Sequence, residues 1–199
     1  MLKKIINFCI LFFLLICSAV AEQIKKIEIS GNQRISEQTI LVLGKISINQ
    51  DFNDQKINES FKSLYESNFF QDIKISIFNG VLKIDLIENP IIENIEIVGI
   101  KNKGFVDKIL EYMTLKNRMS FTENQLQSDI IIIENALKAN GFYFSKVDPF
   151  KTVNKDLNSI SLKIQIDQGE KAKIKEIIFI GDKKIKDKKL LEVIASEEH

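Results

Sequence analysis

A short phrase that recurs along the chain most constrains its fold. "KIEISGNQRI" covers residues 26–35, "NIEIVGIKNK" covers 94–103, and "IIFIGDKKI" covers 177–185. In the first copy Ile27 and Ile29 alternate with polar side chains, and a glycine follows the apolar run in all three copies. A period of two that ends at glycine predicts a strand followed by a turn. Its recurrence predicts tandem copies of one structural unit.

Two helices are predicted after the first strand. Ser36 can cap a short helix that carries Ile40 and Leu43 and ends at Gly44. Asn53 can cap a second helix, because its side chain accepts hydrogen bonds from exposed amides of the first turn. The apolar residues of that helix recur at the spacing of one helix face, at Ile57, Phe61 and Leu64.

A pair of strands completes the first unit. Isoleucines alternate with other residues between Asp72 and Phe78, and apolar residues alternate again between Leu82 and Leu86. Asn79-Gly80 separates the two runs, and this dipeptide favours a two-residue hairpin because both residues accept positive φ. The predicted order is strand, helix, helix, strand, strand.

The second copy repeats this order with a longer second helix. Its first helix is predicted from Phe105 to Met113, and Thr122 with Gln125 predicts a capping box for the next. The segment from that cap to the following turn is four residues longer than in the first copy. Four residues are about one helical turn, so the buried face stays in phase. Pro149 lies in the next strand, which predicts a sheet edge because proline cannot donate to a ladder.

The predicted fold class is α+β, with tandem β-α-α-β-β units, each a three-stranded sheet covered on one face by two helices. Residues 22–90 are predicted to form the first unit and residues 91–170 the second. Residues 171–199 are predicted to begin a third unit, with a strand at Ile177 and Phe179 and a helix that includes Ile194. Because this segment is too short to bury both elements, we expect the chain to be a fragment of a longer protein.

Residues 1–21 have the pattern of a secretory signal peptide. Two lysines precede an apolar run of about 13 residues, and Ala19 and Ala21 form a small-x-small motif that predicts cleavage before Glu22. An uncleaved membrane anchor is the alternative, but it requires about 20 apolar residues. The sequence therefore favours export and removal of this segment.

Composition excludes several classes of site. Cys9 and Cys17 both lie in the segment expected to be removed, which excludes a disulfide framework and a thiolate metal site in the mature chain. The loss of Lys3 and Lys4 leaves 26 basic against 27 acidic side chains. This balance does not indicate nucleic acid as a partner.

No catalytic, cofactor-binding or metal-binding residues are predicted. The chain has one histidine, His199, and its glycines follow strands singly, which indicates turns and not a phosphate loop. Aromatic residues recur where each second helix meets a strand, at Phe69-Phe70 and at residues 142–144. We expect them to pack on the cores, and the alternative is that they bind a client chain.

Tandem units of this order behind a signal peptide resemble polypeptide-transport-associated (POTRA) domains. "IEISGNQRIS", "LYESNFFQDIKISIFNGVLKIDLIENP" and "IIENIEIVGIKNK" resemble the amino-terminal region of the BamA family of outer-membrane protein assembly factors. The second copy departs from the pattern, with Ile100 and Lys101 where the first has Asn32 and Gln33. The resemblance implies further POTRA units and an outer-membrane β-barrel in the rest of the protein. It also implies that this region lies in the periplasm at the cell outer membrane.

The resemblance implies a non-enzymatic scaffold. Its implied partners are unfolded outer-membrane β-barrel proteins, accessory assembly lipoproteins and periplasmic chaperones. Two alternatives stay open: the POTRA region of a secretion or translocation transporter, and an inner-membrane division scaffold resembling FtsQ.

Edge strands are the candidate binding surface, because their unpaired N–H and C=O groups can be joined by an extended peptide in β-augmentation. We predict that residues 72–78 and 146–152 form such edges and that the first binds more readily, since Pro149 interrupts the second. In the alternative the edges are only solvated, and Lys74 and Lys151 oppose aggregation. The predicted peptide-binding residues are Asp72, Ile73, Lys74, Ile75, Ser76, Ile77, Phe78, Val147 and Asp148.

Overall fold

The structure is a computed structural model that describes residues 22–181, 186–191 and 193. The chain divides between Asn89 and Pro90 into two units, here called unit 1 and unit 2. The described part of each unit contains a three-stranded sheet and two helices of eight or more residues, so the predicted α+β fold class is confirmed.

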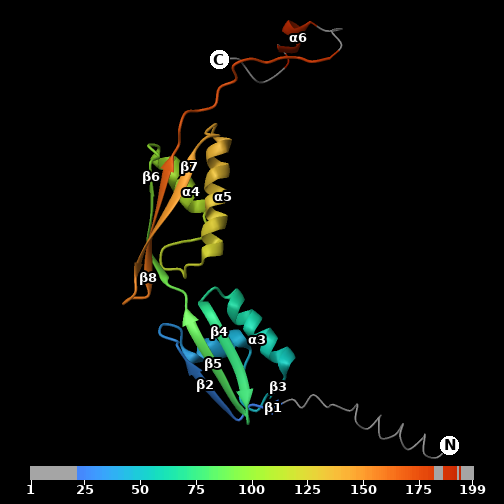
Figure 1. Ribbon diagram of the computed structural model, residues 1–199, viewed down its shortest axis with the longest axis vertical. Helices are drawn as coiled ribbons and strands as arrows, with labels where there is room; N and C mark the ends of the chain where they lie inside the picture. The colour runs from blue at the N-terminus through green and yellow to red at the C-terminus, as the bar shows by residue number, and fades with distance from the viewer. Residues whose placement is uncertain (1–21, 182–185, 192, 194–199) are drawn as a thin grey trace, which may run out of the picture. The chain divides into compact units, whose positions relative to one another are not determined.

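Unit 1 has the predicted order of elements, with two additions. Its main sheet has the strand order β2-β5-β4, in which β2 is parallel and β4 antiparallel to β5. Figure 1 shows α3 beside β4. A second, two-stranded sheet joins β1 to β3 and was not predicted. The elements are β1 (Glu22–Gln23), β2 (Lys26–Ser30), α2 (Glu37–Gly44), β3 (Asp51–Phe52), α3 (Asp54–Glu66), β4 (Phe70–Phe78) and β5 (Val81–Glu88).

Local sequence signals account for the ends of these elements. The Ser36 hydroxyl accepts a hydrogen bond from the N–H of Thr39 at 3.2 Å, and the side chain of Asn53 accepts one from Lys56 at 2.9 Å, so both predicted caps are confirmed. The prediction that α2 ends at Gly44 is confirmed. Gly44 is helical, and Lys45 adopts the left-handed conformation at φ 54°.

The hairpin between β4 and β5 is the one that the sequence predicts. Asn79 and Gly80 have φ of 52° and 78°, which matches the two positive values of a type I′ turn. This turn fixes the register of the sheet, because it places Phe78 opposite Val81.

Unit 2 repeats the topology, with the strand order β6-β8-β7 and α5 beside β7 (Figure 1). The hydroxyl of Thr122 caps α5 as predicted, by accepting from the N–H of Gln125 at 3.3 Å. The first helix begins earlier than predicted, because Asn102 caps it by accepting from the N–H of Phe105. The elements are β6 (Ile91–Val98), α4 (Lys103–Tyr112), α5 (Glu123–Ala139), β7 (Lys146–Asn154) and β8 (Ser159–Asp167).

A glycine at the end of the first strand marks the same place in both units. Gly31 and Gly99 have φ of 83° and 96°. A Cβ atom would overlap the carbonyl oxygen of Leu86 at Gly31 and that of Ile166 at Gly99. Two separate features therefore require glycine at these positions: the positive φ, and the close approach of the adjacent strand, β5 in unit 1 and the strand that contains Ile166 in unit 2. Leu86 and Ile166 are counterparts in the two units.

Each unit has its own hydrophobic core. The core of unit 1 includes Ile40, Leu64 and Leu82, and that of unit 2 includes Leu126, Leu137 and Ile164, all fully buried. The inward side chains of β8 are buried as the alternation predicts, at Ile160, Leu162, Ile164 and Ile166.

The aromatic residues between each second helix and the following strand pack on the cores only in part. Phe70 is buried, and Phe69 and Phe142 pack against the cores. Tyr143 and Phe144 are exposed by 60% and 80%, so the prediction that they pack was wrong. They lie in the turn before β7, where both side chains face solvent.

The third copy does not form the predicted strand. Residues 170–181 have no assigned strand or helix, and Ile178 and Ile180 are exposed. Alternation alone was insufficient, since a strand also requires a neighbour to pair with. A short helix, α6 (Asp187–Leu191), follows. Ile194 and the predicted signal peptide, with Ala19 and Ala21, lie outside the described residues.

Candidate strand-binding edges

β4 lies at one edge of the sheet of unit 1. Of the strands in residues 22–181 it pairs with β5 alone. A register shift between Phe70 and Asp72 marks a bulge, after which the ladder is regular to Phe78. Bulges interrupt edge pairing. The regular stretch therefore begins at Asp72, the first residue of the predicted peptide-binding segment.

The hairpin determines which backbone groups of β4 face outward. In a two-residue hairpin the pair next to the turn, here Phe78 and Val81, exchanges hydrogen bonds. Hydrogen-bonded and non-hydrogen-bonded pairs then alternate along an antiparallel ladder. We therefore expect Ile73, Ile75 and Ile77 to direct their N–H and C=O groups away from β5.

The side chains of this edge alternate between core and solvent. Ile73 is buried, and Ile75 and Ile77 pack against the core from half-buried positions. Asp72 and Lys74 form an exposed ion pair at 3.9 Å, which contributes little to stability. Ser76 and Phe78 are also exposed. The solvent face that an added strand would extend is polar at Asp72, Lys74 and Ser76 and aromatic at Phe78.

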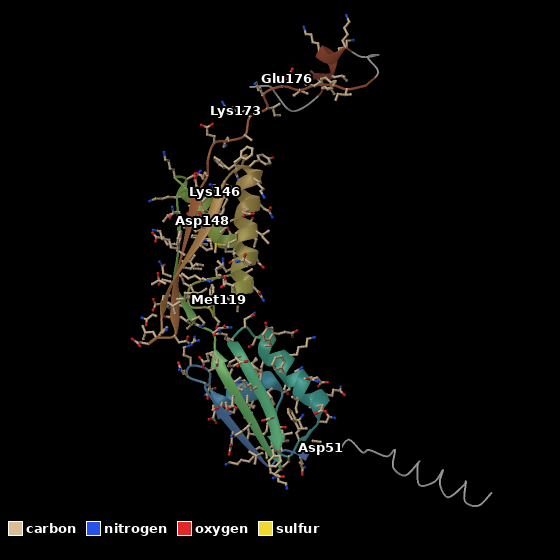
Figure 2. All side chains as sticks on the ribbon, viewed as in Figure 1. Asp51, Met119, Lys146, Asp148, Lys173 and Glu176 are labelled. Atoms are coloured by element: carbon tan, nitrogen blue, oxygen red, sulfur yellow. The ribbon has the colours of Figure 1, made fainter. Side chains whose placement is uncertain are left out.

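β7 occupies the same edge of unit 2. Val147 is half-buried, whereas Lys146 and Asp148 are exposed, and Figure 2 shows the latter two on β7. Pro149 pairs with Ile164, as Ile75 pairs with Ile84 in unit 1. Because Ile84 and Ile164 both lie two residues before the counterparts Leu86 and Ile166, Pro149 is the counterpart of Ile75. Unit 2 thus lacks one outward N–H group that unit 1 has.

Lys151 of β7 forms contacts that oppose the addition of a strand at this edge. The Nζ of Lys151 lies 2.8 Å from a carboxylate oxygen of Glu123, at the start of α5. The same amine lies 5.8 Å from the centre of the Phe121 ring. A charged residue held at an edge is one of the devices that oppose strand addition.

The sequence did not identify the other two edges, β2 and β6. Two helices separate each of these strands from the next strand of its three-stranded sheet, which is the signal for a crossover that returns the chain to the sheet. β2 is only five residues long, against nine for β4. A shorter edge offers fewer hydrogen bonds to an added strand, so β4 is the better candidate.

Glu88 is a buried carboxylate that sequence reasoning missed. Its Oε1 accepts hydrogen bonds from the N–H groups of Gln33, Arg34 and Ile35 at 2.7, 2.9 and 2.9 Å. Nε of Arg34 lies 3.2 Å from Oε2. Burial opposes ionisation, but these amides and the Arg34 guanidinium outweigh it and hold the pKa of Glu88 below its usual value. The carboxylate fastens the loop between β2 and α2.

Asp129 has a comparable structural role in unit 2. It is fully buried on α5, where Oδ1 accepts from the N–H of Thr114 at 2.6 Å and Oδ2 accepts from that of Leu115 at 2.9 Å. Buried carboxylates are tolerated when they are hydrogen-bonded in this way.

Two kinds of feature are absent from the described part of the chain. Its residues contain no group of three or more histidine, cysteine, aspartate or glutamate side chains that could hold a metal ion. Its helices include none with the length and apolar character needed to cross a membrane.

Comparison with known families agrees with this architecture. The family model described as "POTRA: Surface antigen variable number repeat" matches residues 22–88 and 90–169. Those two segments correspond to the sheets and helices of units 1 and 2. The chain belongs to the POTRA family.

Curated relatives confirm the resemblance to BamA-type outer-membrane protein assembly factors. The chain is 28% identical over 180 residues to the outer membrane protein assembly factor BamA of Neorickettsia risticii, which covers 89% of the chain and 24% of that protein. It is also 28% identical to BamA of Neisseria meningitidis over 84% of the chain and 21% of that protein. The chain spans less than a quarter of the length of either relative.

A solved structure shows the same fold. The N-terminal domain of Omp85 from Thermosynechococcus elongatus matches with a TM-score of 0.50 and 14% identity, over 77% of this chain and 64% of that one.

Proposed function

We propose that this POTRA region binds extended segments of unfolded outer-membrane proteins by β-augmentation along Asp72–Phe78 of β4. The observation that carries the proposal is a regular edge of seven residues with β5 on one side and no described strand on the other. Backbone pairing gives affinity without strict dependence on client sequence. Such tolerance suits a protein that assembles many different clients.

The relatives support the cellular context of the proposal. They are named as outer-membrane protein assembly factors, so we propose that this region acts in the periplasm and without catalysis. Docking of accessory assembly lipoproteins and periplasmic chaperones belongs to the same proposal. Unit 2 contributes a weaker edge at Val147 and Asp148, since Pro149 removes an outward donor there.

The two edges provide a reciprocal test. Ile75→Pro introduces into β4 the proline that β7 has naturally, and Pro149→Ile removes it from β7. We expect Ile75→Pro to weaken binding of an extended client peptide by about tenfold, the equivalent of about 1.4 kcal/mol. Pro149→Ile should strengthen binding at β7, because it restores the missing N–H group. Backbone amide chemical-shift mapping with 15N-labelled protein measures both effects.

Ile75→Val is the matched control, because it shortens the side chain and keeps the N–H group. It should bind the peptide as the native protein does. Peptide-induced shifts spread evenly outside residues 72–78 in the native protein would contradict the proposal. Equal binding by Ile75→Pro and Ile75→Val would also contradict it.

A further inference from the structure

Unit 2 contains a basic pocket at the end of its sheet. The pocket, here called the lysine pocket, has a volume of about 510 Å³. It is lined by Lys101, Asn102, Gly104, Phe105, Lys108, Asn140, Phe142, Gln168 and Lys171. Three of these side chains are cationic and none is acidic. None of the three lysines forms an ion pair with any residue that the structure describes.

In unit 1 a carboxylate occupies the position that corresponds to Gln168 of this pocket. Glu88 lies two residues after Leu86, and Gln168 lies two residues after its counterpart Ile166. In unit 1 the Glu88 carboxylate accepts three backbone N–H groups from the loop after Gly31. In unit 2 the corresponding side chain is a neutral amide that forms no hydrogen bond with the described residues. The negative charge supplied by Glu88 in unit 1 has no counterpart among the residues that line the lysine pocket.

The loop beside the pocket also differs from its counterpart in unit 1. From Gly99 to the helix cap Asn102 it is two residues shorter than the loop from Gly31 to Ser36. Lys101 belongs to this shorter loop and lines the pocket. Cations that share one hollow repel each other, and a bound anion relieves that repulsion.

Aromatic side chains form the apolar part of the wall. Phe105 and Phe142 are half-buried and pack against the core of unit 2, so their positions are fixed. Nζ of Lys171 lies 5.4 Å from the centre of the Phe142 ring, which holds this amine at the pocket. The lining therefore suits a ligand that carries an anionic group next to an apolar one.

We propose that the lysine pocket binds an acidic side chain of a partner polypeptide, next to an apolar residue that packs on Phe105 and Phe142. The partner carboxylate supplies the charge that Glu88 supplies internally in unit 1. The proposal concerns unit 2 and does not depend on strand addition at β4 in unit 1.

The test uses a capped peptide, acetyl-Leu-Glu-Phe-amide, and its analogue with glutamine in place of glutamate. We expect saturable amide shifts at Lys101, Gln168 and Lys171 with the acidic peptide, and binding about tenfold weaker for the glutamine analogue. Equal affinity for the two peptides would overturn the proposal. Equal or tighter binding of inorganic phosphate would overturn it too, because the pocket would then be an unselective anion site.

Gln168→Glu provides the decisive variant, since it places in unit 2 the carboxylate that unit 1 has. We expect this substitution to weaken binding of the acidic peptide by about tenfold, because the new glutamate side chain would occupy the pocket in place of the peptide carboxylate. Gln165→Glu is the matched control: it adds the same charge on an exposed position of β8 that does not line the pocket. Similar loss of binding in both variants would show a general charge effect and would overturn the proposal. Lys108→Gln should weaken binding without the added carboxylate, and unchanged affinity would contradict the assigned role of this lysine.

Discussion

Glu88 shows how one residue can determine the shape of a loop. Three amides of the loop between β2 and α2 converge on a single carboxylate oxygen, and the Arg34 side chain also donates to the carbonyl oxygen of Asn89 at 2.6 Å. Hydrogen bonds to a charged acceptor are stronger than those between neutral groups. The loop therefore depends on the ionised form of Glu88.

The lowered pKa of Glu88 predicts a pH dependence for the stability of unit 1. In the unfolded chain this carboxyl takes up a proton near 4.5, and in the folded protein it does so at lower pH. The stabilisation is therefore present above about pH 4.5 and is lost as the pH falls through the lower, folded-state pKa. We expect Glu88→Gln to destabilise unit 1 at pH 7 by about 1.5–3 kcal/mol and to reduce the loss on acidification. Urea unfolding at pH 7 and at a series of pH values below 4.5 measures both quantities.

Glu59→Gln is a suitable control, because Glu59 is exposed on α3. Its effect should stay within about 0.5 kcal/mol at pH 7. An identical pH dependence in the native protein and Glu88→Gln would disprove the assignment to Glu88.

At the scale of elements, α5 is fixed to the segment after α4 by Asp129. This carboxylate lies in the middle of the helix and bonds the backbone of Thr114 and Leu115, and also the Thr114 hydroxyl at 2.9 Å. The contact joins two elements that are adjacent in the fold but about fifteen positions apart in the sequence.

Asp129→Ala should destabilise unit 2 markedly, because it leaves buried N–H groups without an acceptor. Each such group costs about 1–3 kcal/mol. Asp107→Ala on the exposed side of α4 is the control, with an expected effect within about 0.5 kcal/mol. Chemical denaturation followed by circular dichroism gives the difference. A small and equal effect of the two substitutions would refute the structural role of Asp129.

The elements also show which features the sequence could predict. The caps at Ser36, Asn53 and Thr122 and the turn at Asn79-Gly80 were predictable because each signal lies within a few residues of its effect. The β1–β3 pair was not predictable, since two-residue strands have no detectable period. The three bonds to Glu88 span at least 53 positions, and nothing local marks them. The strand predicted at Ile177 and Phe179 failed for the opposite reason, because the local pattern was present without a pairing partner.

At the scale of the whole molecule, the residues that the structure describes form two cores that share no residue. The core of unit 1 is drawn from residues 24–86 and that of unit 2 from residues 92–166. All residues of each core lie within one unit. We therefore expect each unit to fold and unfold separately.

Matched core truncations test this separation. Leu64→Ala in unit 1 and Leu137→Ala in unit 2 each remove a fully buried leucine that follows the same helical pattern. Each should lower the stability of its own unit by about 2–5 kcal/mol. Residue-resolved hydrogen exchange should show faster exchange in the altered unit and native rates in the other. Faster exchange throughout both units in either variant would mean that the chain unfolds as one cooperative body.

The small sheet of β1 and β3 bears on the predicted cleavage before Glu22. Glu22 pairs with Phe52, and Ile24, which is fully buried, exchanges backbone hydrogen bonds with Gln50 and Asn49. If the leader is cut before Glu22, the newly exposed amino terminus belongs to a strand and not to a loose tail. Cleavage three residues later would remove β1 and the buried side chain of Ile24, so we propose that the position of cleavage affects the stability of unit 1.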